Sequence, residues 1–372
     1  MVSFFTNYEG DGQFSMLRYA DELETSLRLY SGSMFELHRH APRHNGKSAS
    51  RTVSRLKKYF EYPYLARRYS GQINHITDHG NSHVIRFLPA DRTIITCHDL
   101  IPLRLADRLT GSSKRIKYSF WAKVVHMRKA AAVLADSEST RRDVITFLGL
   151  PAENVHVVHL GLNHERFRPL QHFESKEGLR RKLGFSWPVT LLHVGAPAFY
   201  KNLEAVIDVV AVLRQLYHLD VHLVRSGSPL PEGLHQLIRR RGIGTFVHDI
   251  KVTNDSELRE LYLASDVLLF PSLWEGFGWP PLEALACGLP VVSSDRGSLP
   301  EVTGSAALQI DPEDLQGMVE AVREIIGDER LGEHLRAAGL LHASNFQWQK
   351  TAAQTAQVYR AVWEKTRGDS YS

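Results

Sequence analysis

Short apolar runs alternate with segments of helical periodicity along this chain, and this alternation restricts the fold more than any other feature. Residues 188–195 form an apolar run that ends in Gly195, residues 203–216 place apolar side chains at helical spacing, and residues 220–227 form the next apolar run. Runs that are apolar throughout are typical of strands buried on both faces. The repetition therefore predicts a parallel sheet with helices on both sides.

The same pattern is present in both halves of the chain, which predicts two doubly wound α/β domains. A length of 372 residues agrees with this, because it is about twice the common size of one domain. We expect strands at residues 2–5, 93–97, 131–135, 155–159, 188–195, 220–227, 266–271 and 289–294, and helices at residues 203–216, 234–241, 282–286 and 351–365. A polar stretch makes residues 168–185 the expected linker. The predicted domains are residues 1–170 and 171–350, followed by a last helix in 351–372.

Composition excludes several classes of protein. With 43% hydrophobic and 23% charged residues, the chain has little room for wholesale disorder. No run of about eighteen apolar residues is present, so we expect no helix that spans a bilayer, and the first residues turn acidic too soon for a signal peptide. Cys97 and Cys287 lie far apart in the sequence, which excludes a disulfide framework and a structural zinc site and favours a reducing cytoplasm.

Positive charge is concentrated in the first half of the chain. Residues 1–170 contain 25 Lys and Arg against 16 Asp and Glu, whereas the remainder contains 20 against 25. Between Arg39 and Arg68 the only acidic residue is Glu61, and Phe60 and Tyr64 are interleaved with the basic residues. This stretch is either a surface for anionic lipid or another polyanion, or a solvated helical face. Nucleic acid is not expected as a partner, because no recognition module accompanies the charge.

Residues 270–292 carry the clearest sign of a ligand site. A strand that ends at Phe270 is followed by a glycine-containing loop and by a helix that begins near Pro280 and Pro281. Prolines fit the first helical turn, because the N–H that they lack would have no partner there. The remaining backbone amides and the helix dipole make such a helix start attractive to phosphate.

Two glutamates frame this loop, Glu275 before Gly276 and Gly278, and Glu283 in the expected first turn of the helix. Carboxylates repel a phosphate unless they bind something neutral and rich in hydroxyl groups, so the segment predicts a sugar nucleotide. The alternative is purely structural. The glycines would then supply unusual dihedral angles, and Glu283 would interact favourably with the helix dipole.

The whole string from Phe270 to Val292 resembles the Glu-x7-Glu signature of retaining glycosyltransferases of the GT-B fold, in particular family 4. Further segments resemble the same family along nearly the whole chain: residues 96–100, 135–140, 159–163, 194–203, 298–301 and 346–348. The resemblance implies two Rossmann-like domains that face a central cleft. It also implies an acceptor held by the N-terminal domain, a nucleotide sugar bound by the C-terminal domain, and a last helix that returns to the N-terminal domain.

The resemblance also implies which residues act. It gives catalytic roles to His98, Lys201 and Glu275. The implied donor-binding set is Gly12, Gly195, Lys201, Lys251, Val252, Glu275, Gly276, Phe277, Gly278, Leu282 and Glu283. Within it, Lys201 would bind the diphosphate, Glu275 the sugar hydroxyls, Glu283 the ribose diol, and the backbone near Lys251 and Val252 the base. The structural alternatives are a buried, hydrogen-bonded imidazole for His98 and a surface lysine without a ligand for Lys201.

Two positions depart from the family pattern. The family usually supplies an arginine with the lysine, but Ala196 and Tyr200 occupy the two usual positions, so Arg225 and Arg296 become the candidate phosphate-binding arginines. The N-terminal glycine loop is also altered, because Gly10 and Gly12 are not adjacent.

The resulting prediction is a retaining hexosyltransferase that uses a nucleoside-diphosphate sugar, of the GDP-mannose or UDP-glucose type, and a glycan or lipid-linked acceptor in polysaccharide synthesis. No cofactor is expected, and no metal ion, because no Asp-x-Asp motif stands at a strand end. The expected location is the cytoplasm, with peripheral attachment to an anionic membrane surface. The alternatives are a GT-B epimerase or hydrolase that acts on the sugar nucleotide without an acceptor, and a non-enzymatic polyanion-binding protein.

Overall fold

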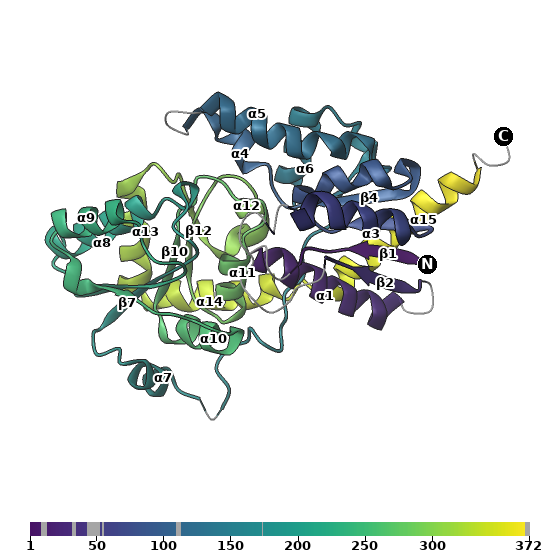
Figure 1. Ribbon diagram of the computed structural model, residues 1–372. Helices are drawn as coiled ribbons and strands as arrows, with labels where there is room; N and C mark the ends of the chain where they lie inside the picture. Colours follow the sequence, from purple (N-terminus) through teal and green to yellow (C-terminus); the bar gives the residue numbers. More distant parts are fainter. Residues whose placement is uncertain are drawn as a thin grey trace. The chain divides into compact units, whose positions relative to one another are not determined.

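The computed structural model describes residues 1–8, 13–31, 35–42, 53, 56–108, 113–172 and 174–368. It divides into two compact units, one of residues 1–161 with 347–372 and one of residues 162–346. Each unit contains a six-stranded sheet in which every strand pair is parallel (Figure 1). The predicted fold class of two doubly wound α/β units is confirmed. The chain passes from the first unit to the second after residue 161 and returns to the first after residue 346. The sequence analysis placed these two boundaries at residues 170 and 350.

The first unit has the strand order β2-β1-β3-β4-β5-β6. Its strands are β1 (Val2–Phe5), β2 (Leu37–His40), β3 (Ile73–Ile76), β4 (Thr93–Cys97), β5 (Ala132–Ala135) and β6 (Val155–Val157). Its helices and helical turns are α1 (Phe14–Ser31), η2 (Lys57–Glu61), α3 (Tyr62–Arg68), η3 (His79–Phe87), η4 (Ala90–Arg92), α4 (Ile101–Arg104), η5 (Ala106–Arg108), α5 (Ser113–Val124), η6 (Val125–Lys129), α6 (Glu138–Leu148), η7 (Ala152–Asn154) and α15 (Trp348–Gly368). The last helix, α15, packs along α1.

The second unit has the strand order β12-β11-β10-β7-β8-β9. Its strands are β7 (Val189–Val194), β8 (Val221–Ser226), β9 (Val247–Asp249), β10 (Val267–Phe270), β11 (Val291–Ser294) and β12 (Leu308–Ile310). Its helices and helical turns are α7 (Lys176–Leu183), η8 (Phe199–Lys201), α8 (Leu203–Gln215), α9 (Glu232–Arg240), η9 (Gly244–Phe246), α10 (Asp255–Ala264), α11 (Trp279–Ala286), α12 (Leu299–Thr303), η10 (Gly304–Ala306), α13 (Leu315–Gly327) and α14 (Glu329–Ala343).

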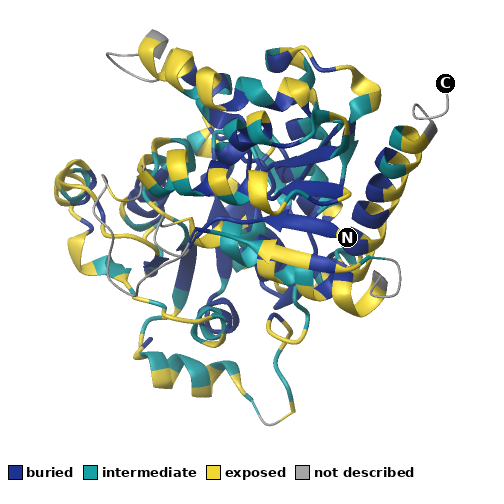
Figure 2. Cartoon of the chain, turned by 45° about the vertical axis from the view of Figure 1, so that its right-hand side comes forward, coloured by how far each residue is buried: buried dark blue, intermediate teal, exposed yellow. Residues whose placement is uncertain are grey.

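The cores lie between the sheets and their helices, and Figure 2 shows strands that are buried along most of their length. Helix α8 illustrates the packing, since Val206, Val209, Val210 and Leu213 face the sheet and all are buried. None of the helices in the described ranges is long and apolar enough to cross a membrane.

The stretch expected as a linker, residues 168–185, is instead part of the second unit and contains α7. Lys176 and Arg180 on this helix form ion pairs with Asp266, at 2.6 and 3.2 Å, just before β10. The helix was missed because few of its residues are apolar, and none is fully buried. Polar anchoring of this kind leaves no hydrophobic period in the sequence.

Candidate functional site

The carboxyl ends of β7 and β10 form the topological switch point of the second sheet, because the chain winds from β7 toward β9 on one side and from β10 toward β12 on the other. Open parallel sheets bind ligands in the crevice at such a point. The chain that follows β7 contains Gly195 and Lys201, and the chain that follows β10 contains Glu275. Two of the three predicted catalytic residues therefore lie at this edge.

Lys201 and Glu275 are in direct contact. The ammonium group of Lys201 donates to Oε1 of Glu275 at 2.7 Å, and the two side chains are only 13% and 9% exposed. The ammonium group also lies 5.0 Å from the ring centroid of Phe270 and 5.5 Å from that of Tyr200, within the range of a cation–π interaction. The two charged groups are thus largely shielded from solvent at the carboxyl ends of β7 and β10. An anionic group of a ligand can bind the ammonium group of Lys201, and hydroxyl groups can donate to the carboxylate of Glu275.

The loop that carries Glu275 is held in place from its back. The hydroxyl of Ser298 donates to the backbone carbonyls of Glu275 and Phe277, at 3.1 and 2.6 Å, and the amide of Ser298 also donates to Glu275. Gly297 has φ +67°, and a Cβ there would lie 2.9 Å from backbone atoms of Glu275. The loop geometry therefore depends on a glycine and a serine in the segment between β11, the strand next to β10, and α12.

Helix α11 begins directly after this loop. Gly278 has φ 109° and precedes Trp279, and prolines occupy the first helical turn, as the sequence predicts. The amides of residues 276–279 therefore come at a helix start whose dipole favours negative charge. Phe277 is buried and packs edge to face against Phe346.

Glu283 lies deeper than expected. Helix α11 starts at Trp279, so Glu283 falls beyond the first turn, where the sequence analysis placed it, and it is only 2% exposed. The hydroxyl of Tyr262 on α10 donates to its Oε2 at 2.8 Å. The neighbouring donor-site residue Leu282 is fully buried. This arrangement satisfies the carboxylate of Glu283 within the unit.

The two candidate phosphate arginines already have acidic partners. Arg225 is 2% exposed and donates from Nε to Asp249, with its Nη1 directed to the carbonyl of Gly195 at 3.5 Å. Arg296 donates from Nη2 to both oxygens of Asp311 at 2.7 and 2.9 Å. Arg225 therefore supports the glycine loop from behind, and Arg296 is bound to the segment after β12.

Of the remaining predicted donor residues, Lys251 and Val252 follow β9 in the second sheet, with Lys251 exposed and Val252 partly buried. Gly195 directly follows β7, and a Cβ on the facing Gly227 would lie 2.0 Å from its carbonyl oxygen. The two strand ends therefore approach closely through glycine. Gly12 lies outside the described residues.

His98 lies at the end of β4 in the first unit and is 5% exposed. Its Nδ1–H donates to Asp136 at 2.7 Å, and its Nε2–H donates to the carbonyl of Thr77 at 2.9 Å. Burial alone would lower the pKa of His98, but the carboxylates of Asp136 and Asp78, together with these hydrogen bonds, raise it to about 9. Its contact with the transferred sugar stays a prediction, and the imidazolium serves an internal network here.

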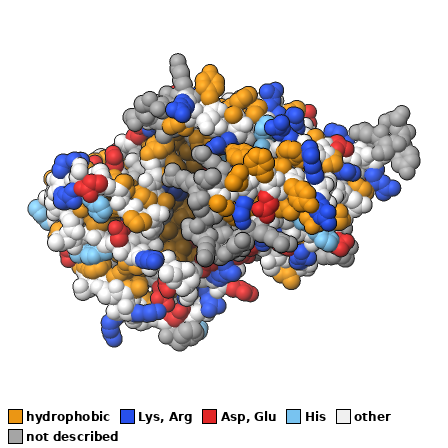
Figure 3. Space-filling view, viewed as in Figure 1, with side chains coloured by type: hydrophobic (Ala, Val, Ile, Leu, Met, Phe, Trp, Pro, Cys, Tyr) orange, Lys and Arg blue, Asp and Glu red, His pale blue; other side chains and the backbone are white. Residues whose placement is uncertain are grey.

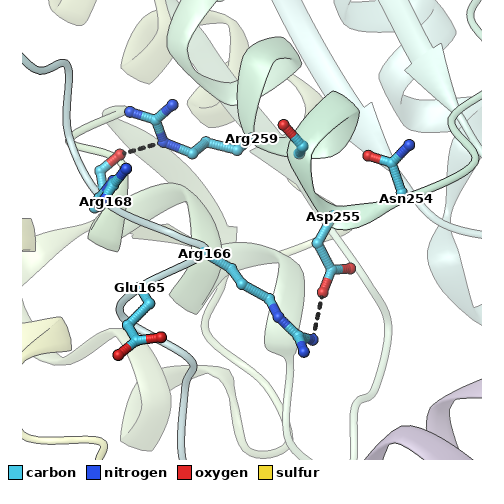
Figure 4. Close-up of a pocket in the computed structure, with 7 residues that line it drawn as sticks. Glu165, Arg166, Arg168, Asn254, Asp255 and Arg259 are labelled. Carbon is cyan, nitrogen blue, oxygen red and sulfur yellow. Dashed lines mark hydrogen bonds and ion pairs between the residues drawn. The ribbon is translucent and has the colours of Figure 1, made fainter.

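A cavity of about 630 Å³ in the second unit lies at the start of α10 (Figure 4). Arg166 on its wall forms an ion pair with Asp255 at 2.9 Å, and Arg259 donates to the carbonyl of Arg168 and binds Glu174. None of the predicted site residues lines it. Within the described ranges no group of three His, Cys, Asp or Glu side chains could hold a metal ion.

Two family models match this chain, one mainly within each of the two units. Residues 175–341 match the family model for glycosyl transferases group 1, and residues 30–166 match the model for glycosyltransferase family 4. Together these matches cover more than half of the chain. The chain belongs to the group 1 glycosyltransferases. The retaining mechanism and the role of the two glutamates stay predictions.

Several curated relatives of this glycosyltransferase are mannosyltransferases. The serotype-specific mannosyltransferase WbdA of Escherichia coli is 30% identical over 75% of this chain and 35% of its own length, so the chain spans about a third of WbdA. The O-antigen chain mannosyltransferase B of Escherichia coli is 29% identical over 73% of this chain and 69% of its own length. A sucrose-phosphate synthase from Thermosynechococcus elongatus has the same GT-B fold, with a TM-score of 0.77, 17% identity and coverage of 98% and 99%.

Sequence reasoning did not assign two residues that shape this glycosyltransferase's site. Tyr262 holds Glu283, and Ser298 holds the backbone around Glu275. The sequence gives no signal for Tyr262, which lies within an ordinary helical pattern. Ser298 belongs to a segment that resembles the family, but its contact with the loop depends on the pairing of β10 with β11.

Proposed function

We propose that this glycosyltransferase transfers a hexose, with retention of anomeric configuration, from a nucleoside-diphosphate sugar to a glycan or lipid-linked acceptor. The observation that supports this most directly is the Lys201–Glu275 pair beside the start of α11. Cation and amides are suited to the charge that develops on a leaving diphosphate. Glu275 is suited to the hydroxyls of the sugar.

In the proposed reaction the bond between the anomeric carbon and the diphosphate oxygen breaks, and the acceptor oxygen forms the new bond on the same face. The acceptor's proton passes to the leaving phosphate, so no other reactant is needed. The sugar passes through an oxocarbenium-like state. The protein's contribution is electrostatic, with Lys201 and the backbone amides of residues 276–279 stabilising the diphosphate.

The remaining donor contacts are proposed by family resemblance. Glu283, positioned by Tyr262, would bind the ribose diol, and the backbone at Lys251 and Val252 would bind the base. We favour GDP-mannose as the donor because curated relatives are named mannosyltransferases, with UDP-glucose as the alternative. The reaction is proposed to need no metal ion and to serve polysaccharide synthesis.

A thermal-shift panel tests the donor assignment, since a ligand that binds the native state raises the unfolding temperature by mass action. We expect GDP-mannose to give a larger shift than UDP-glucose, in buffer with EDTA. Transfer of radiolabelled mannose to methyl α-D-mannopyranoside then tests the reaction. No shift with either nucleotide sugar and no product would overturn the proposed function. Donor consumption that does not depend on the acceptor would favour the epimerase or hydrolase.

We also propose peripheral attachment to an anionic membrane through the first unit. The described part of the stretch between Arg39 and Arg68 includes η2 and α3, where Phe60 is 71% and Tyr64 60% exposed. Lys57, Lys58, Arg67 and Arg68 flank these rings. Figure 3 shows hydrophobic and basic side chains side by side over these helices. We call η2 and α3 the basic-aromatic surface; nucleic acid is not a proposed partner.

A further inference from the structure

The first sheet has its own topological switch point, between β1 and β3, because the chain winds to β2 on one side and to β4, β5 and β6 on the other. A buried polar network occupies the strand ends there. Asn7 donates to Asp78 at 2.7 Å, Asn81 donates to Asn7 at 2.7 Å, and the amide of Gly80 donates to Asp78 at 2.7 Å. Every member of this network is hydrogen-bonded to another member, so the network occupies this edge of the sheet.

His98, at the end of the neighbouring strand β4, has buried partners for both of its ring nitrogens. Its two ring nitrogens donate to Asp136 and to the carbonyl of Thr77. A sugar oxygen could reach neither nitrogen without breaking one of these buried bonds. Both ring nitrogens of the histidine that the sequence singles out therefore have partners within the first unit in this structure.

His79 is the first residue of η3, and unlike His98 it has a hydrogen-bond partner at only one of its ring nitrogens among the described residues. The backbone N–H of His98 donates to its Nδ1 at 3.3 Å, and its ring packs edge to face against Phe120. The side chain is 10% exposed, and its Nδ1 also lies 3.5 Å from Oδ1 of Asp78. Among the described residues, none forms a hydrogen bond with its Nε2. Because Nδ1 accepts a hydrogen bond, a neutral ring carries its proton on Nε2. His79 thus presents one oriented N–H donor at the switch point.

We propose that the Nε2–H group of His79 binds the attacking hydroxyl oxygen of the acceptor. A hydroxyl oxygen has lone pairs for this bond while its own proton remains free to pass to the leaving phosphate. His79 would therefore orient the nucleophile without acting as a base. This inference rests on the proposed function and on the family resemblance, which implies that the N-terminal domain holds the acceptor.

Kinetics of three variants test the proposal, with GDP-mannose and methyl α-D-mannopyranoside as substrates. His79→Phe keeps a ring against Phe120 but removes the donor, and we expect kcat/KM for the acceptor to fall about tenfold with KM for the donor within about twofold. His79→Gln places an amide N–H near the position of Nε2 and should recover most of the loss. His126→Phe on η6, a partly buried histidine, is the matched control. Equal losses in the Phe and Gln variants, an unchanged acceptor kcat/KM, or an effect on donor KM alone would overturn the proposal.

Long-range ¹H–¹⁵N spectra of histidine-labelled protein separate this proposal from the proposed function. The His79 signals, assigned by their loss in His79→Phe, should show the Nε2–H tautomer and should shift on addition of methyl α-D-mannopyranoside. An Nδ1–H tautomer, or signals unmoved by the glycoside, would overturn the role of His79 even in an active enzyme. If the parent transfers no sugar, the proposed function fails, and the spectra alone decide whether His79 binds a sugar hydroxyl.

Discussion

Lys201 and Glu275 are 74 residues apart in the sequence, and their side chains are in contact at the carboxyl end of the second sheet. Substituting each of them separately tests the role of each charged group. Glu275→Gln keeps the shape and a hydrogen bond but removes the charge. We expect transfer to fall by about tenfold or more, because a charge-assisted bond to the sugar is weakened, while nucleotide affinity stays nearly unchanged. Calorimetry with GDP and initial rates with GDP-mannose check both halves. Full activity in this variant would remove Glu275 from the mechanism.

Lys201→Ala should behave differently, with losses in both GDP affinity and rate. Its ammonium group forms an ion pair with Glu275 at the switch point of the second sheet. Arg225 and Arg296 form ion pairs with Asp249 and Asp311 instead. We expect Arg296→Ala, the matched control, to change affinity by less than about threefold, since its partners are exposed acids. The same two assays are used. A larger loss in Arg296→Ala or Arg225→Ala than in Lys201→Ala would identify the substitute phosphate arginine.

His98 makes stability depend on pH. Its pKa in the folded protein is about 9, above the ordinary value of 6.5, so the charged form stabilises the fold fully below pH 6.5. The contribution, about 3 kcal/mol for such a shift, should disappear as the pH rises through 9. Urea unfolding between pH 6 and 10 should show this decline in the parent and a flatter profile in His98→Gln. Parallel profiles would mean that the His98–Asp136 pair does not carry the charge.

At the scale of elements, apolar strands were predictable and polar ones were not. Strands β1, β4, β7 and β10 coincide with apolar runs, but β3 reads Ile-Asn-His-Ile and β2 reads Leu-His-Arg-His. His75 in β3 is fully buried because its ring bonds to Thr96 and to Tyr359, which is 284 residues away. A partner at that distance leaves no local pattern. The site followed the same rule, since strand-end residues were found and the positions of Tyr262 and Ser298 were not.

The bond between His75 and Tyr359 anchors α15 to the first sheet, and its removal should be measurable. Tyr359 is fully buried, and its hydroxyl lies 2.6 Å from Nδ1 of His75. Tyr359→Phe leaves that nitrogen without a partner inside the core, which should cost about 1–3 kcal/mol of unfolding free energy. Tyr118→Phe, on the 71% exposed ring of Tyr118, is the matched control and should cost nothing measurable. Equal stability of the two variants in urea would show that the bond does not anchor the helix.

At the scale of the whole molecule, charge is unevenly divided along the chain. Residues 1–170 have 25 basic against 16 acidic residues, and the remainder has 20 against 25. A net charge of +4 hides this difference. An anionic surface would therefore attract the first unit in particular, and the exposed rings of Phe60 and Tyr64 are side chains suited to a lipid interface.

Vesicle co-sedimentation tests whether the basic-aromatic surface holds the enzyme on a membrane. Polybasic attraction is worth about 1 kcal/mol per side chain near an anionic leaflet, so roughly four engaged residues would give reversible binding at low salt. We expect sedimentation with phosphatidylglycerol vesicles, little with phosphatidylcholine, and loss in a Lys57→Glu, Lys58→Glu variant. Lys365→Glu with Arg367→Glu on α15 makes the same change in net charge elsewhere in the first unit and should leave binding within about threefold. Equal losses in both double variants would reduce the effect to net charge, and no sedimentation of the parent with either vesicle would remove the membrane and leave a solvated helical face.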